Sequence, residues 1–395
     1  MANVSSSNGL EKRPKLRFPG FDEPYRKCRI GDIYAERSQR GAGDMELLSV
    51  TMNDGVMPRS EIEGKDNSSE DKSNYKVVCK GDIVYNSMRM WQGANGVSNY
   101  DGIVSPAYTV LMPTEEIDNQ YFAALFKTAN LINEFRKNSQ GLTSDTWNLK
   151  YPQIRAIKLY IPSLQEQHKI SSFISTLEER IGKQRQLIDD LKKYKRGLHE
   201  FVFLKNRKES WKKTALKNIA SFCGGGTPSK DISSYWNGNI GWISSSDIQD
   251  EWIDEISVTR RITKSAIDNS ATKICPKGTI AIVSRVGVGK VSVMSDSLCT
   301  SQDFTNITSI IGNTRYMAYQ IAFKMKIEAA KTQGTSIKGV TSDTIKSMVV
   351  DIPTLGEQEH IADMLSTFDL HIKREIHNLN ILLVMKKSLL QQLFI

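Results

Sequence analysis

A segment of 43 residues occurs twice in this chain, and its pattern limits the possible folds more than any other feature. Residues 161–203 align with residues 352–394 without a gap, at an offset of 191, and 13 of the 43 positions are identical. Each copy opens with Ile-Pro-x-Leu-x-Glu-Gln, in which Ser163 or Thr354 precedes the glutamate by three residues. This spacing is typical of a capping box, where a hydroxyl and a carboxylate satisfy the first amides of a helix. Both copies are therefore predicted to begin a helix.

Seam residues, nearly all apolar, then recur at alternating intervals of four and three, as in a coiled coil. The seam runs through about five heptads, which predicts two helices of about 40 residues, each about 60 Å long. Two amphipathic helices that cover separate cores are the alternative, but five heptads exceed what one globular face needs. The central seam positions are Ile181, Gln184, Ile188, Leu191, Lys195 and Leu198 in the first copy, and Ile372, Glu375, Leu379, Leu382, Lys386 and Leu389 in the second.

Two polar positions in each seam suggest how the helices pair. Gln184 and Lys195 are eleven residues apart, as are Glu375 and Lys386. In an antiparallel pair, one register sets Gln184 against Lys386 and Lys195 against Glu375. A polar layer costs stability but fixes the register. We therefore expect an antiparallel coiled coil in this register.

The segments before the two helices predict globular modules. Each contains short β-branched and aromatic runs and one helix, at 120–138 and at 314–332. The predicted fold class is α/β, in the α+β sense, with two duplicated domains separated by the coiled coil. The expected boundaries are a polar basic tail at 1–16, a first domain at 17–160, a first spacer helix at 161–205, a second domain at 206–351 and a second spacer helix at 352–395.

Two weaker matches extend the repeat into the domains. Glu23-Pro24-Tyr25 parallels Glu209-Ser210-Trp211 at an offset of 186, and Lys80-Gly81 parallels Lys277-Gly278 at an offset of 197. The offsets drift, so insertions distinguish the two copies. Thr-Ser-Asp-Thr occurs at 143–146 and at 341–344, but its offset of 198 breaks the alignment, and we interpret it as a coincidence.

The composition indicates a protein that binds an anionic partner. Lys and Arg number 53 against 44 Asp and Glu, a net charge of +9, which favours nucleic acid or an acidic surface. No apolar run reaches the roughly 18 residues of a membrane span, and the polar N-terminus lacks a signal-peptide core, so no membrane partner is expected. The five cysteines lie far apart, without a Cys-x-x-Cys motif. This usage predicts a cytoplasmic protein with neither a disulfide framework nor a zinc site.

The motifs of several enzyme classes are missing from the sequence. Gly287-Val288-Gly289-Lys290 lacks the four-residue spacing of a phosphate loop, and the isolated prolines exclude the Asp/Asn-Pro-Pro-aromatic motif of amino-methyltransferases. No histidines form His-Glu-x-x-His. Glu63-Gly64-Lys65 resembles half of a nuclease site, but a solvated acidic loop explains it better. The sequence therefore predicts no catalytic residue, no metal site and no cofactor bound to this chain.

Three further signals accompany the duplicated helices. They are Arg17-Phe18-Pro19-Gly20-Phe21 near the start, Trp211 (Tyr25 in the first copy) at the opening of each domain, and Gly225-Gly226-Thr227-Pro228-Ser229. With the repeated Ile-Pro-x-Leu-x-Glu-Gln, this layout resembles the specificity subunit of type I restriction–modification enzymes over nearly the whole chain from Arg17. The chain departs from that family at Tyr25, where a tryptophan is usual, and in its first domain, which lacks Gly-Gly-Thr-Pro-Ser.

The resemblance implies a sequence-specific DNA-binding protein that is not itself an enzyme. In that family the two globular domains are target-recognition domains, each of which reads one half of a bipartite, asymmetric site in double-stranded DNA. The helices form an antiparallel spacer. Two methylation subunits and the restriction/translocase subunits assemble on the specificity subunit, and S-adenosylmethionine, ATP and Mg²⁺ would bind to those partners.

Loops that follow a strand at equivalent places in the two domains are the best candidates for contact with DNA. Arginine guanidinium groups and side-chain amides form hydrogen bonds with base edges, and cations in general bind phosphates. The first-domain candidates are Asn86, Arg89, Trp91, Gln92 and Asn95, and the second-domain candidates are Ser284, Arg285 and Lys290. Secondary candidates are Thr143, Trp147, Thr227, Ser336 and Lys338. The ordinary polarity of solvated loops is the alternative explanation for any one of these residues.

One cluster of charge stands apart from the rest of the chain. Residues 192–213 contain nine Lys or Arg and two Glu, so this basic cluster carries +7 of the net +9. It would contact the DNA backbone or a partner, or it would be a linker whose charge aids solubility. The near-neutral remainder suggests that the methylation subunits supply much of the phosphate neutralisation.

Two rival functions fit the same layout. A coiled-coil DNA-binding regulator or scaffold is one, although the sequence shows no convincing helix-turn-helix. The specificity subunit of a related combined cut-and-modify system is the other, and these residues do not separate it from a type I subunit.

Overall fold

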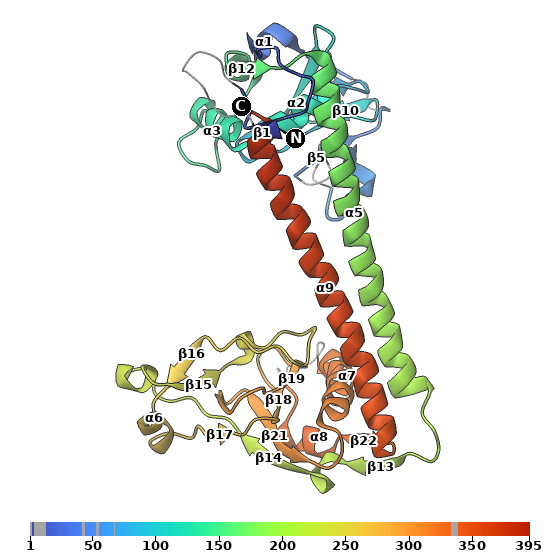
Figure 1. The fold of residues 1–395 in the computed structure, drawn as a ribbon, viewed down its shortest axis with the longest axis vertical. Coiled ribbons are helices and arrows are strands. Elements are labelled where there is room, and N and C mark those ends of the chain that lie inside the picture. Colours follow the sequence, from blue (N-terminus) through green and yellow to red (C-terminus); the bar gives the residue numbers. More distant parts are fainter. Residues whose placement is uncertain (1, 4–12, 42–43, 53–54, 67, 333–338) are drawn as a thin grey trace. The chain divides into compact units, whose positions relative to one another are not determined.

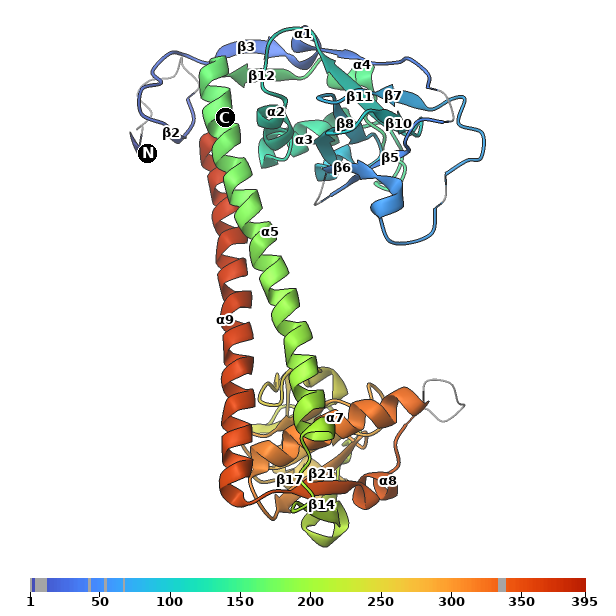
Figure 2. The same ribbon diagram turned by 90° about the vertical axis from the view of Figure 1, so that its right-hand side faces the viewer.

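The computed structural model describes residues 2–3, 13–41, 44–52, 55–66, 68–332 and 339–395, so most of the expected tail at 1–16 lies outside the described residues. The chain divides into two compact units, Met1–Arg185 with His377–Ile395, and Gln186–Ile376. Two long helices, α5 (Leu164–Glu200) and α9 (Leu355–Leu393), each contribute one part to either unit (Figures 1 and 2).

The first unit is built on an antiparallel sheet in the order β4 (Tyr34–Glu36), β11 (Tyr108–Pro113), β8 (Ile83–Asn86) and β9 (Asn95–Val97). Antiparallel pairs join β1 (Ala2–Asn3) to β2 (Leu16–Arg17), β3 (Arg26–Arg29) to β12 (Lys158–Ile161), β5 (Leu48–Thr51) to β6 (Gly55–Pro58), and β7 (Lys76–Val78) to β10 (Gly102–Val104). The helices are α1 (Ile30–Ile33), α2 (Asn119–Leu125), α3 (Ala129–Asn138) and α4 (Tyr151–Ile154), with short 3₁₀ helices at Arg59–Glu61 and Met90–Gln92.

The single helix predicted at 120–138 is two helices in the structure. α2 ends at Leu125, and α3 begins at Ala129. Phe126 and Phe135 are both fully buried, and their rings meet edge to face with centroids 5.7 Å apart. Residues nine positions apart lie on opposite faces of an unbroken helix. The break therefore allows both rings to enter the same core.

The second unit contains an equivalent antiparallel sheet in the order β14 (Ala220–Gly224), β21 (Phe304–Ile310), β18 (Ile280–Val283) and β19 (Val291–Val293), and β13 (Lys212–Ala215) pairs with β22 (Val349–Ile352). A further sheet, in the order β16 (Arg260–Ile262), β15 (Ile240–Ile243), β20 (Leu298–Thr300) and β17 (Ile274–Cys275), includes the parallel pair of β15 with β20. The helices are α6 (Lys264–Asp268), α7 (Thr314–Thr332) and α8 (Ser342–Ser347), with 3₁₀ helices at Leu216–Asn218, Ser233–Trp236 and Ser245–Asp247 and a π-helical segment at Phe201–Lys205.

The two units confirm the predicted duplication of mixed α/β domains. The strand order β4-β11-β8-β9 corresponds to β14-β21-β18-β19, and the pair β3·β12 corresponds to β13·β22. Gly81 and Gly278 stand at the same turn before β8 and β18, with φ of +98° and +85°, which glycine adopts without strain. The helix predicted at 314–332 is α7.

The C-terminal end of each long helix completes a domain core that begins elsewhere in the sequence. In the first unit, Phe394 is buried and its ring centroid lies 5.2 Å from that of Tyr121. In the second unit, the equivalent Phe203 is buried 6.0 Å from the ring of Tyr316. The first domain therefore depends on the end of α9, and the second on the segment that follows α5.

The two long helices run antiparallel, as the heptad pattern predicts. In the first unit, Lys386 near the end of α9 forms an ion pair with Glu178 in the first half of α5. In the second unit, Lys195 near the end of α5 lies 2.6 Å from Asp369 in the first half of α9, measured from Nζ to Oδ1. The start of each helix therefore packs against the end of the other.

The predicted register of this pair is wrong by about one heptad. Lys386 meets Glu178 rather than Gln184, and Lys195 meets Asp369 rather than Glu375, a shift of six residues, or about 9 Å, in each unit. A shift of one heptad keeps apolar seam positions opposite each other, so the seam pattern does not distinguish the two registers. The domain cores do distinguish them, because the end of α9 must reach the first-domain core.

Candidate DNA interface

A buried glutamine joins the start of each long helix to its domain. In the first copy, Gln167 Nε2 donates to the Pro162 carbonyl over 3.0 Å, and its Oε1 accepts from the Asp118 N–H over 3.1 Å. In the second copy, Gln358 Nε2 donates to the equivalent proline carbonyl over 2.9 Å, and its Oε1 accepts from the Asn313 N–H over 2.8 Å. Because Asp118 and Asn313 precede the domain helices α2 and α7, the repeated Glu-Gln fixes where each spacer helix leaves its domain.

The glutamate beside this glutamine has a different partner in the first copy from the one predicted. Glu166 N–H approaches Ser163 Oγ at 3.5 Å, as in a capping box. Its carboxylate, however, is fully buried and accepts from Arg17 Nε at 2.9 Å and Nη2 at 2.8 Å, with the Tyr25 hydroxyl at 3.3 Å. The hydrogen bond to Glu166 raises the pKa of Arg17. Arg17, recognised in sequence as part of a motif, thus anchors the start of α5.

In the second copy the predicted capping box is complete. The Thr354 N–H donates to Glu357 Oε2 over 3.1 Å, and the Glu357 N–H donates to Thr354 Oγ1 over 3.4 Å. Lys208 lies 2.6 Å from the same carboxylate and, together with Thr354, lowers the pKa of Glu357 to about 2. Lys208 stands 191 residues after Arg17, the offset of the repeat, so both copies pair the glutamate with a cation.

The first-domain loop after β8 exposes only some of its predicted contact residues. Arg89 and Gln92 are exposed, and Asn86 is half-buried, with its Oδ1 accepting from the Met88 N–H over 3.0 Å. Trp91 is half-buried and donates from Nε1 to the Met88 carbonyl over 3.0 Å. Asn95 lies in β9 and is fully buried, so its side chain is not exposed on the surface of this loop.

The structure brings Trp147, a secondary candidate from a distant loop, to Trp91. Their rings meet edge to face with centroids 5.3 Å apart, and the Arg136 guanidinium lies 5.4 Å from the Trp91 ring centroid. Arg136 is exposed on α3 and was missed in the sequence, because nothing in its own helix indicates that it faces a tryptophan 45 residues earlier.

The loop at 140–148 projects beside this aromatic pair. Its ends pair through the Gln140 N–H to Asn148 carbonyl bond of 3.0 Å and the reverse bond of 2.8 Å. Thr143 is exposed and its carbonyl accepts from Thr146 Oγ1 over 3.0 Å. Leu142 is completely exposed. The first domain therefore presents polar, cationic and apolar side chains on adjacent loops.

The second-domain loop after β18 differs in what it exposes. Arg285 is exposed, whereas Ser284 is buried and donates from Oγ to the Asp303 carbonyl over 2.9 Å. Lys290 is half-buried and donates to the Ser245 carbonyl over 3.1 Å. The candidates Ser336 and Lys338 lie outside the described residues.

A cavity of about 660 Å³ beside Arg285 gathers further polar side chains of the second domain. Gln302 and Lys346 line it, and Gln302 Oε1 accepts a hydrogen bond from the Thr227 hydroxyl. The sequence indicated Thr227 and Arg285 but missed Gln302 and Lys346, because only the fold brings α8 and the β20–β21 connection to this loop.

One backbone hydrogen bond joins the candidate loops in the same way in both domains. The Leu149 N–H donates to the Ser87 carbonyl over 2.8 Å, and the Val340 N–H donates to the Ser284 carbonyl over 2.8 Å. Leu149 and Val340 are 191 residues apart. The Thr-Ser-Asp-Thr at 143–146 precedes this bond, whereas the copy at 341–344 follows it, which agrees with their interpretation as a coincidence.

Both domains match one family model, described as the type I restriction modification DNA specificity domain, at residues 27–193 and 208–381. The two matches together cover most of the chain. The chain belongs to this family. Its duplicated domains are two DNA specificity domains in tandem.

Curated relatives from this family are specificity subunits. The chain is 34% identical over 165 residues to the type I restriction enzyme MjaIX specificity subunit of Methanocaldococcus jannaschii, and 30% identical over 188 residues to the EcoR124I/EcoR124II specificity subunit of Escherichia coli. These matches span 41% and 45% of this chain but only 38% and 45% of the relatives. The putative MjaX specificity subunit of M. jannaschii is 24% identical over 344 residues, which are 79% of this chain and 77% of that protein.

Solved structures share the fold over nearly the full length. The S subunit of a type I restriction-modification system from M. genitalium has a TM-score of 0.58 and covers 97% of this chain and 99% of its own. The HsdS subunit from Thermoanaerobacter tengcongensis has a TM-score of 0.53, covering 98% and 99%. A chain from a study of complex assembly and conformational transition of the type I R-M system has a TM-score of 0.63, covering 96% and 99%. Each is 14% identical to this chain, so these likenesses show the fold alone.

Most cations of the basic cluster at 192–213 form ion pairs with carboxylates of their own unit. Lys192 lies 2.8 Å from Glu251 and Lys195 lies 2.6 Å from Asp369. Further pairs hold the cations of the same cluster: Lys193 with Asp190, Arg207 with Asp351, and Lys208 with Glu357. Five of its nine Lys and Arg therefore already have a carboxylate partner.

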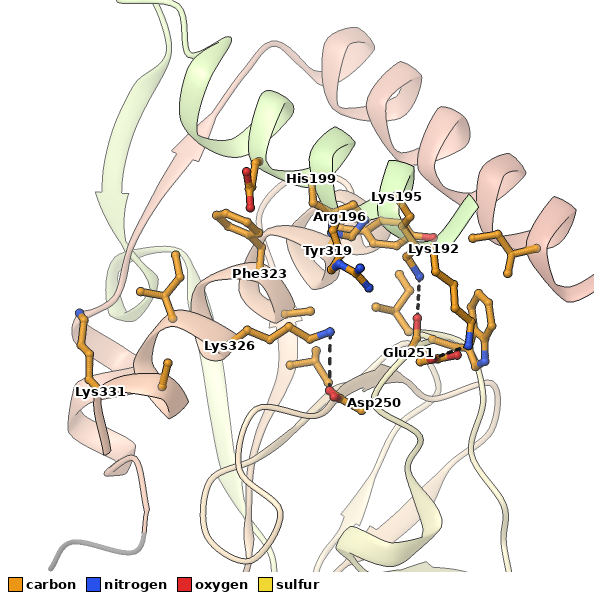
Figure 3. Close-up of a pocket in the computed structure, with 18 residues that line it drawn as sticks. Lys192, Lys195, Arg196, His199, Asp250, Glu251, Tyr319, Phe323, Lys326 and Lys331 are labelled. Carbon is orange, nitrogen blue, oxygen red and sulfur yellow. Dashed lines mark hydrogen bonds and ion pairs between the residues drawn. The ribbon is translucent and has the colours of Figure 1, made fainter. Parts of the chain in front are cut away.

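A cavity of about 810 Å³ lies where this cluster meets α7 (Figure 3). Phe323 and Ile327 of α7 form part of its wall, and Arg196 extends toward it from α5. His199 also lines it, between the rings of Phe203 and Tyr319, and burial lowers the pKa of His199 to about 3. The basic cluster therefore borders a partly apolar hollow.

Two negative findings apply to the described ranges. No helix there is both long enough and apolar enough to span a lipid bilayer. No three His, Cys, Asp or Glu side chains there gather as the ligands of a metal ion would.

Proposed function

We propose that this chain is the DNA specificity subunit of a type I restriction–modification complex, and that it reads a bipartite, asymmetric site in double-stranded DNA. The observation that carries the proposal is the pair of family domains, each with the same junction between its candidate loops. Two domains that share a scaffold and differ in their exposed loop residues are suited to reading two different half-sites. The chain contributes recognition rather than catalysis.

In this proposal the target-recognition domains are residues 17–160 and 206–351, and the spacer helices are 161–205 and 352–395. The DNA sequence is recognised where exposed guanidinium groups and amides form hydrogen bonds with base edges. In the first domain, Arg89 and Gln92 meet that requirement, and the exposed Arg136 is placed to bind a phosphate or a base.

In the second domain, the reading surface is the cavity beside Arg285. Arg285 and Lys346 supply positive charge there, and Gln302 supplies an amide. The Thr227 hydroxyl donates a hydrogen bond to Gln302 Oε1, so the side-chain N–H groups of Gln302 remain available as donors. Such donors match base acceptors in the major groove.

The partners in this proposal are two methylation subunits and the restriction/translocase subunits. Each spacer helix leaves its domain through the same glutamine junction, at Gln167 and at Gln358, so two copies of one methylation subunit find equivalent surroundings. S-adenosylmethionine, ATP and Mg²⁺ bind to those partners. The complex works in the cytoplasm, where it reaches DNA.

The basic cluster is assigned to a partner subunit rather than to DNA. A surface that tracks phosphates needs cations that are free to pair with them. Most cations of the cluster are already paired, and the adjoining cavity has the apolar wall residues Phe323 and Ile327. Such a mixture of apolar and cationic groups is typical of a protein–protein contact.

The test is to express the chain with a type I methylation subunit from the same organism in a host without DNA methylation, and to sequence the methylated bases. We expect one bipartite motif. Replacement of residues 17–160 by the matching domain of a relative should change one half of the motif and leave the other. Methylation without a bipartite motif, or a change in both halves, would contradict the proposal.

A further inference from the structure

Leu142 extends from the first domain into solvent. Its side chain is 101% exposed, the highest value among the exposed large hydrophobic residues of the described ranges. Single exposed leucines are common on protein surfaces and need no explanation by themselves. Leu142 differs from such residues because a constrained turn holds its backbone in place.

Both neighbours of Leu142 belong to a constrained turn. Gly141 has a φ of +145°, and a Cβ at this position would lie 2.6 Å from the Thr146 carbonyl oxygen, so the turn requires glycine here. On the other side, the Thr146 N–H and Oγ1 both donate to the Thr143 carbonyl, each over 3.0 Å. Leu142 is thus fixed at the tip of a preformed loop.

The base of this loop is aromatic and cationic. Trp147 meets Trp91 edge to face, and Arg136 lies over the Trp91 ring. The Trp91 indole N–H is already used by the Met88 carbonyl, so this tryptophan has no free donor for a base edge. The contribution of the pair is a stiff apolar support, and Arg136 lies beside it as a cation for a flanking phosphate.

We propose that Leu142 is a wedge that inserts between adjacent base pairs at the half-site read by the first domain. This inference rests on the proposed function. Proteins that kink DNA insert an apolar side chain into a base step and hold the flanking phosphates with cations. The loop that carries the leucine must be rigid, because a mobile loop would move aside and leave the bases stacked.

The wedge adds specificity at a position that no hydrogen bond reads. Pyrimidine–purine steps unstack more easily than other steps, so an inserted leucine favours a flexible step at one place in the first half-site. Leu142 is in this sense a specificity-determining residue. Arg89 and Gln92 form hydrogen bonds with base edges, whereas Leu142 favours DNA whose base step unstacks easily.

The experiment uses the full chain in complex with its methylation subunit and duplexes of the methylated motif. 2-Aminopurine, whose fluorescence rises on unstacking, replaces one purine at a time in the first half-site. Adenines that become methylated are left out, because methyltransferases flip their target base. We expect a several-fold rise in fluorescence at one step with the natural chain, and loss of that rise with Leu142→Ala.

Three further variants make the result specific. Leu142→Phe should retain the signal, because an aromatic ring is also a wedge, whereas Gly141→Val should lose it through a displaced loop. Ile311→Ala is the matched control, since Ile311 is a 66% exposed apolar residue of the second unit outside the proposed reading surfaces. It should change neither the signal nor the motif.

The outcomes separate this inference from the proposed function. If specific binding occurs without a rise at any step, or if Leu142→Ala keeps the rise, the wedge is refuted and the DNA-reading function stands. If the complex shows no sequence-specific binding at all, the proposed function fails, and the wedge fails with it. With the expected result, Leu142→Ala should also weaken binding to the motif by about tenfold, because alanine buries much less apolar surface between the bases than leucine does.

Discussion

The Arg17 guanidinium lies 2.8 Å from the Glu166 carboxylate, and both side chains are almost completely buried. Removing one partner of such a pair leaves a buried charge without compensation, which costs about 3–5 kcal/mol. Arg17→Met should therefore lower the free energy of unfolding of the first unit by this amount, as measured by urea denaturation. The double variant with Glu166→Met should recover most of the loss, because a buried pair replaced by apolar groups is nearly neutral.

The matched control for this prediction is Lys208→Met in the second copy. Lys208 occupies the equivalent position, but its pair with Glu357 is solvent-exposed. Exposed pairs are screened by solvent and contribute little to stability, so Lys208→Met should lose much less than Arg17→Met. Equal losses for Arg17→Met and Lys208→Met would show that burial does not decide the strength of this junction.

The register of the two helices can be tested by charge reversal. Lys386→Glu should lower the melting temperature, because it places two acidic side chains together at Glu178. Glu178→Lys should then restore a pair, for a gain of about 1 kcal/mol at this half-exposed site. Gln184→Lys is the control and should not restore it. Rescue by Gln184→Lys alone would support the register expected from the sequence.

The length of the helices should set the gap between the two half-sites. Adding seven residues to each helix, between Glu178 and Lys195 in α5 and between Asp369 and Lys386 in α9, keeps both ion pairs and the seam. The helices lengthen by about 10 Å. The gap in the methylated motif should then grow by about three base pairs, at about 3.4 Å each, with both half-sites unchanged.

Adding four residues to each helix is the matched control for this prediction. Four residues rotate the seam by about half a heptad, so the pair should lose its packing and the complex its methylation activity. Methylome sequencing reads both outcomes. An unchanged gap after the seven-residue insertion would show that the helices do not measure the site.

His199 should make the second unit sensitive to acid. Burial lowers its pKa to about 3 in the folded protein, against about 6.5 in an unfolded chain. Between these values the unfolded state binds the proton and the folded state does not, so stability is complete above pH 6.5 and falls with decreasing pH. At pH 4 the loss from this one group is about 3 kcal/mol.

His199→Phe should remove this part of the pH dependence in thermal unfolding followed from pH 7 to pH 4. The phenyl ring can occupy the same place between Phe203 and Tyr319. His360→Phe is the control, because His360 is exposed on α9. If the natural chain and His199→Phe lose stability in parallel, His199 is not the acid-sensitive group.

The sequence was sufficient to predict the architecture because two independent patterns agree. The heptad seam predicts the long helices and their antiparallel pairing, and the repeat predicts that the domains are duplicated. The register could not be predicted, because a slide of one heptad leaves a similar apolar seam. Only the three-dimensional requirement that Phe394 reach Tyr121 decides between the alternatives.

The loops after β8 and β18 could be predicted, but not which of their residues are exposed. Asn95 and Ser284 are polar residues in the expected loops, yet both are buried, because β9 and the Asp303 carbonyl hold them. Arg136 and Gln302 have no local signal, since helices and strands distant in sequence bring them to the loops. Burial and long-range neighbours are properties of the fold, and a pattern of single residues does not contain them.

The position of Phe394 in the first-domain core also determines when that domain can mature. Ribosomes add residues in order, so the segment 17–160 leaves the exit tunnel long before residues 393 and 394 exist. At about 5–20 residues per second, the first domain waits roughly ten to fifty seconds for the end of its own core. During that interval Tyr121 and its apolar neighbours are not covered by the end of α9, so this core stays incomplete far longer than one formed from a single continuous segment.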